Sequence, residues 1–178
     1  MLLTEIPTLD ELLNAYAETL GNDFTSYRNH TYRVANLCVA LSSDDPVQLQ
    51  KIAISAGFHD LGIWTDNTFD YLQPSVRLAT AYLAQSDRVD WASEVTGMIL
   101  EHHKTTPYRD EPQSLIEPFR RADWVDVSRG LITFGLPRKL LGHIFAAWPN
   151  AGFHRRLLQL SLKRLLTHPF SPLPMMRL

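Results

Sequence analysis

Apolar residues recur every three to four positions along nearly the whole chain, which is the spacing of one face of an α-helix. Leu9, Leu12 and Leu13 follow this spacing near the start of the chain, and Leu158 and Leu162 follow it near the end. No stretch combines the alternation of apolar and polar residues with the hairpin turns that strands would need. The sequence therefore predicts an all-α fold.

Helix start and stop signals divide this pattern into segments. Thr8 and Glu11 form a capping box, and Asp45 before Pro46 is a typical N-cap followed by proline in the first turn. Gly21 is expected to end the first helix. The expected helices cover approximately residues 8–20, 27–41, 46–59, 74–84, 90–102, 117–127, 137–148 and 152–166.

Composition limits the classes of partner. A chain of 178 residues is long enough for one domain with its own core, and its net charge of -2 provides no basic field for a nucleic acid polymer or an anionic membrane. The single cysteine, Cys38, cannot form an internal disulfide. No apolar segment approaches the roughly 20 residues of a membrane span. We therefore expect a cytoplasmic protein that acts on small molecules, and self-association stays open.

Histidine and aspartate residues mark the ends or inner faces of several expected helices. His30 lies one turn before Val34 on an apolar face, and the pair His59-Asp60 ends the segment 46–59. Asp123 follows in a later helix. Helical bundles assemble metal sites from facing helices in this way, and imidazole with carboxylate suits Mn, Fe, Co, Ni, Zn or Mg. A cysteine-based zinc cage is excluded because the chain has one thiol.

Four stretches together resemble the HD domain superfamily of metal-dependent phosphohydrolases. They are residues 27–34 with His30, 58–62 with His59-Asp60, 99–103 with His102-His103, and 121–126 with Asp123. The resemblance implies a helical bundle and one divalent metal ion. The match covers approximately residues 27–130, which we expect to be the metal-binding core of a single domain, and it leaves 131–178 unassigned, where accessory helices and a tail are expected. The metal ligands it implies are His30, His59, Asp60 and Asp123.

The chain departs from the better-defined branches of this superfamily. Ile63 stands where the nucleotidase branch often has glutamate and the cyclic dinucleotide phosphodiesterase branch has lysine. No Gly-Tyr-Pro motif follows His102-His103, and the segment 74–84 contains no histidine for a second metal. One metal is therefore favoured, while the adjacent His102 and His103 leave a second one open, and the resemblance does not identify the substrate.

The expected activity is hydrolysis of a phosphate ester of a small nucleotide-like molecule. The base would be His102, His103 or a metal-bound aspartate such as Asp60. Consecutive residues of a regular helix point about 100° apart, so only one of His102 and His103 is expected in the pocket, and His103 is preferred. The cations near the proposed site that could bind phosphate are Arg33, Lys104, Arg120 and Arg121.

Two other functions remain open. One is addition of water to a small neutral substrate, as in HD-family cyanamide hydratases, and the other is metal or nucleotide sensing without turnover. The pocket wall is expected at 64–75 and 105–111. For Asp126 an exposed or capping role is preferred, and support of the metal ligands from behind is the alternative, whereas structural roles are expected for His143, His154 and His168.

Overall fold

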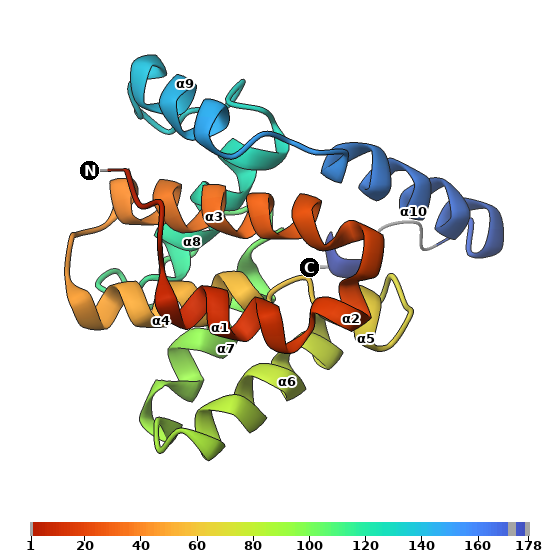
Figure 1. Ribbon diagram of the computed structural model, residues 1–178, viewed down its shortest axis with the longest axis horizontal. Coiled ribbons are helices and arrows are strands. Elements are labelled where there is room, and N and C mark those ends of the chain that lie inside the picture. The colour runs from red at the N-terminus through yellow and green to blue at the C-terminus, as the bar shows by residue number, and fades with distance from the viewer. Residues whose placement is uncertain (1, 171–173, 177–178) are drawn as a thin grey trace.

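The computed structural model describes residues 2–170 and 174–176. Helices account for all the regular structure in these ranges, which confirms the all-α fold (Figure 1). The α-helices are α1 (Pro7–Ala15), α2 (Ala17–Leu20), α3 (Phe24–Leu41), α4 (Pro46–Phe58), α5 (Gly62–Thr65), α6 (Leu72–Gln85), α7 (Ala92–Glu101), α8 (Ile116–Val127), α9 (Arg138–Ala147) and α10 (Phe153–Thr167). The 3-10 turns are η1 (Gly21–Asp23), η2 (Val89–Trp91) and η3 (Pro174–Met176).

Four helices form a closed ring in which each packs against two others. α3 packs against α4 and α8, and α7 packs against the same two helices. α3 is buried on nearly all sides from Ser26 to Cys38. The side chains that α3, α4, α7 and α8 direct inward therefore meet at the centre of the bundle, and α1 and α6 cover its outside.

The helix ends confirm one sequence signal and contradict another. The Asp45 carboxylate accepts a hydrogen bond from the Gln48 amide, with Pro46 in the first turn of α4. The capping box at Thr8 is wrong, because α1 begins one residue earlier at Pro7. Thr8 is therefore already inside the helix. Proline at the first position needs no amide partner, so it sets this start without a side-chain cap.

The helices α9 and α10 are more than an accessory layer. In Figure 1 they lie along one side of the molecule, next to α3. Trp148, just after α9, stacks on Tyr32 with ring centroids 4.0 Å apart, and Phe153 at the start of α10 stacks on His30 at the same distance. One hydrophobic core runs from Ile6 to Phe153. The C-terminal helices thus complete the core and reach the proposed site directly.

None of the helices in the described ranges combines the length and the apolar character that a bilayer crossing requires.

Candidate metal centre

The ring of helices brings together the four ligands predicted from the sequence. His30 projects from the middle of α3, His59 and Asp60 follow directly after α4, and Asp123 lies in α8. His30 Nε2 lies 2.9 Å from His59 Nε2, 3.6 Å from Asp60 Oδ2 and 3.7 Å from Asp123 Oδ1. All four side chains are buried.

His102 and His103 both point into this site, so the expectation that only one of them would do so is wrong. α7 ends at Glu101, and the two histidines occupy the turn that follows rather than a regular helix. His102 is fully buried with Nε2 3.3 Å from Asp60 Oδ1, whereas His103 is 18% exposed with Nδ1 3.5 Å from Asp123 Oδ2. Their ring centroids lie 3.9 Å apart.

Hydrogen bonds on the far side of each ring orient three of the histidines. Nδ1 of His59 lies 2.8 Å from the Ala56 carbonyl, and Nδ1 of His102 lies 2.6 Å from the Ile99 carbonyl. A carbonyl oxygen only accepts, so Nδ1 carries the proton in both rings. His30 Nδ1 likewise donates to the Asp126 carboxylate at 2.7 Å. In the neutral state, all three rings therefore present an Nε2 lone pair to the centre.

Several atoms at the centre have no hydrogen-bond partner among the described residues. They are Asp60 Oδ1, Asp123 Oδ1 and His102 Nε2. Two lone pairs facing each other at 2.9 Å, as in His30 and His59, repel unless a cation or a proton lies near them. With neutral histidines the two aspartates leave a buried charge of about -2, which a single divalent ion would balance. The donor set therefore fits a metal ion, and His30, His59 and Asp60 are close enough to share one.

The ionisation of these groups follows from burial and from their proximity. Burial alone would lower the pKa of His30, but the Asp126 and Asp60 carboxylates raise it to about 9. Burial raises the pKa of Asp123, whereas the pKa of Asp60 lies well below its usual value because the surrounding histidines outweigh burial. Burial and the nearby His102 lower the pKa of His103 well below its usual value. Without an ion, His30 therefore holds a proton at neutral pH.

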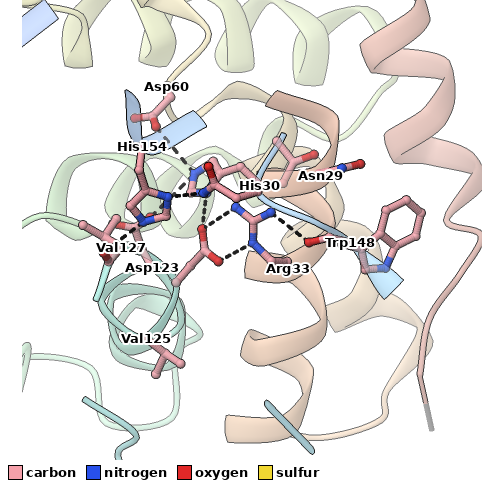
Figure 2. A network of polar contacts seen from close by, with 12 residues as sticks. Asn29, His30, Arg33, Asp60, Asp123, Val125, Val127, Trp148 and His154 are labelled. Carbon is pink, nitrogen blue, oxygen red and sulfur yellow. Dashed lines mark hydrogen bonds and ion pairs between the residues drawn. The ribbon is translucent and has the colours of Figure 1, made fainter. Parts of the chain in front are cut away.

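Asp126 is not the exposed or capping residue that was expected. It is completely buried and binds both His30 and Arg33. Arg33 also donates to the Trp148 carbonyl at 3.0 Å. Figure 2 shows the Arg33 guanidinium turned toward Trp148 and away from Asp60. Arg33 is therefore a structural residue that stabilises the carboxylate behind His30, which corrects its prediction as a substrate ligand.

The other predicted phosphate-binding cations are also engaged elsewhere. Arg120 and Arg121 both donate to the Glu117 carboxylate at 2.7 Å, and Arg120 also donates to the Lys104 carbonyl at 2.9 Å. Arg120 is buried, whereas Arg121 lies at the surface over the Phe134 ring. Lys104, which follows His103 directly, does not line the cavity beside His103 and Asp123. The structure thus does not gather these cations beside the site.

A cavity of about 320 Å³ opens the site on the side of His103 and Asp123. Its wall combines Phe69 and Tyr71 with residues of α8 and α10. Most of the lining is apolar, and among the described residues no lysine or arginine lines it. The prediction that residues 64–75 form the wall is therefore confirmed in part, by Phe69 and Tyr71, whereas residues 105–111 do not line this cavity. The lining residues are Phe69, Tyr71, His103, Asp123, Trp124, Val127, His154, Leu157, Leu158, Ser161 and Met175.

Tyr71 lies within the wall expected at 64–75 but had no expected role of its own, and His154 was expected to be structural; both border the cavity. The Tyr71 hydroxyl lies 2.5 Å from His103 Nε2. Burial and the nearby Asp60 raise the Tyr71 pKa well above its usual value, so the hydroxyl keeps its proton and can donate to His103. His154 Nε2 lies 3.0 Å from the Val127 carbonyl at the cavity wall. Tyr71 follows an irregular loop and His154 lies on α10, so no spacing rule connected either residue to His59-Asp60.

Comparison of the chain with protein-family models, with curated proteins and with solved structures found no match in any of the three.

Proposed function

We propose that this chain is a metal-dependent hydrolase of the HD type, as its sequence motifs imply. The observation that carries this proposal is that several buried atoms able to bind a metal ion lie close together and have no hydrogen-bond partner among the described residues. Nε2 of His102 and one oxygen each of Asp60 and Asp123 face the same small space. A divalent ion held there would lower the pKa of a bound water and polarise a substrate oxygen.

Access to the site favours catalysis over a purely structural metal. A structural site is closed by protein ligands, whereas a catalytic site leaves a position open. Here His30, His59 and His102 are buried, but His103 and Asp123 border the cavity. A small substrate in this cavity would reach the ligand set from the side of His103.

The residues at the cavity edge can position and move a proton. Tyr71 donates to His103 Nε2, which leaves the His103 proton on Nδ1 facing Asp123 Oδ2 at 3.5 Å. The lowered pKa of His103 keeps it neutral at pH 7, and its Nε2, which accepts from Tyr71, can take up a proton that the Tyr71 hydroxyl passes on. Phe153 covers His30 from the opposite side and excludes water there. The chain itself thus orients the His103 ring, provides a proton acceptor and keeps water away from His30.

The motifs favour a small phosphate ester as the substrate. The cavity favours a second candidate, the addition of water to a small neutral substrate. Its lining is mainly apolar, and Arg33 and Arg120 are held by Asp126 and Glu117. A phosphate in this cavity would have to rely on the metal ion for its positive charge.

A substrate screen on metal-loaded protein separates the candidate functions. The protein would be loaded in turn with Mn, Fe, Co, Ni, Zn and Mg, and assayed on phosphate esters and on cyanamide and nitriles. Release of phosphate supports hydrolysis of an ester, and formation of the urea or amide supports water addition. Either activity must disappear in Asp60→Ala and persist in His143→Ala, which removes an exposed histidine of α9. Tight ligand binding without turnover would support a sensor and contradict both enzymatic functions.

A further inference from the structure

A second cavity, of about 250 Å³, lies between α10 and the segment that begins with α5. α10 contributes Arg156, Lys163 and Arg164 to its wall. Lys163 and Arg164 follow Arg156 by seven and eight residues, about two helical turns, and all three border the cavity. The opposite wall includes Trp64 and Phe69. The cavity thus combines cationic side chains with two aromatic rings.

The charge of this lining is strongly positive. Among the described residues, no aspartate or glutamate lines the cavity. Arg156 Nε lies 3.0 Å from Asp23 Oδ2, just outside the lining, so the charge of Arg156 is partly balanced. The same Asp23 oxygen accepts a hydrogen bond from the Trp64 indole at 2.9 Å. Asp23 therefore links the cationic wall to the aromatic wall.

The loop opposite α10 adds polar groups to the same cavity. Asn67 and Thr68 both line it, and Asn67 has a left-handed backbone with φ of 49°. Asparagine tolerates this conformation better than most residues. Guanidinium and ammonium groups bind phosphate and carboxylate through charge-assisted hydrogen bonds, while aromatic rings bind apolar groups. This set of side chains is therefore suited to an organic anion.

We propose that this cavity binds the phosphate or carboxylate group of a small organic molecule, whose apolar part contacts Trp64 and Phe69. This site lies outside the metal ligand set, whose aspartates would repel an anion when no metal is bound. Phe69 borders both cavities, so the ligand would lie next to the cavity at His103. The anionic group could belong to the substrate or to a separate effector.

Calorimetric titration of the metal-free protein with phenyl phosphate tests this proposal. Removing the metal prevents the phosphate from binding an ion, so the result does not depend on the proposed hydrolase function. Lys163→Gln replaces an exposed side chain of the cavity, and Lys139→Gln replaces an exposed lysine on α9 as the matched control. We expect saturable binding that weakens about tenfold in Lys163→Gln, as the loss of one charge-assisted hydrogen bond implies. The control should bind like the unmodified protein. Absence of saturable binding, or equal weakening in both variants, would overturn the proposal.

Turnover assays distinguish the two sources of the anionic group. Phenyl phosphate should compete with the substrate if the group belongs to the substrate, and should change kcat without competition if it belongs to an effector. Under the proposal, either effect is weakened in Lys163→Gln. An effect of unchanged strength in that variant would contradict it, because the anion would then act elsewhere.

Discussion

His30 donates a hydrogen bond from Nδ1 to Asp126 Oδ2 at 2.7 Å, and both side chains are completely buried. This bond directs the other ring nitrogen toward His59 and Asp60. Asp126 is in turn held by Arg33. Carboxylates behind a metal-binding histidine commonly set its tautomer and orientation, and Asp126 fits this role.

Asp126→Asn should weaken metal binding by about ten- to a hundredfold. Asparagine has the same shape, but its NH₂ group would replace one carboxylate oxygen and would face a donor, either His30 Nδ1–H or Arg33 Nε–H. Metal affinity would be measured by competition with a chelator, and circular dichroism would check the helices. Asp110→Asn at an exposed position serves as the control. An affinity for Asp126→Asn equal to that of the control would show that Asp126 does not orient the site.

Tyr71→Phe should reduce kcat while metal content stays unchanged. The phenyl ring preserves the packing, but the hydrogen bond to His103 is lost. We expect a loss of about a hundredfold, at the lower end of the range typical of proton-transfer groups. Tyr108→Phe, away from the cavity, provides the comparison. If the two variants have the same kcat, the Tyr71 hydroxyl has no part in the reaction.

Metal affinity should rise with pH and level off above about 9. The pKa of His30 in the metal-free protein is raised from 6.5 to about 9, so an incoming ion displaces a proton at neutral pH. For the same reason, the contribution of His30 to the stability of the metal-free protein is complete below 6.5 and is lost as pH rises through about 9. Metal titrations in buffers with different ionisation enthalpies would count the released protons. Affinity that does not change with pH would contradict this linkage.

Gly62→Ala should destabilise the protein by about 1–3 kcal/mol, as overpacking does. A Cβ at this position would lie 2.5 Å from the Tyr71 carbonyl oxygen, which is a backbone atom and cannot move aside easily. The glycine after His59-Asp60 therefore permits the close approach of Tyr71 to the site. Gly142→Ala is a matched control, because a Cβ there meets no atom within 4 Å and alanine favours the helix. Thermal unfolding should show a lower midpoint for the first variant and an equal or higher one for the second.

Much of the candidate site could be predicted because its residues lie on or directly after helices. Periodicity placed His30 on the inner face of α3, and the motif order connected His59, Asp60 and Asp123 across the chain. Those four residues meet as expected, with His30 Nε2 within 3.7 Å of the nearest polar atom of each of the others.

The features that the sequence did not predict depend on where a helix ends and on contacts between residues far apart in the sequence. The helical rule failed for His102 because α7 ends at Glu101, before the two histidines. For Asp126 the sequence favours an exposed or capping role over a supporting one, because it does not show that Arg33 lies opposite this residue. Tyr71 follows an irregular loop. Such a loop has no periodic pattern from which the contact of Tyr71 with His103 could be predicted. Local pattern thus predicted the helices and ligands, whereas the surrounding contacts required the fold.

The central claim is that His30, His59, Asp60 and Asp123 bind one divalent ion, and a metal titration tests it most directly. Metal-free protein, His30→Ala and His143→Ala would be titrated with Mn²⁺ or Zn²⁺ under the same conditions. We predict one ion per chain for the unmodified protein and His143→Ala, and an affinity reduced more than about a hundredfold in His30→Ala. Failure of the unmodified protein to bind one ion, or equal affinity in His30→Ala, would contradict the metal centre.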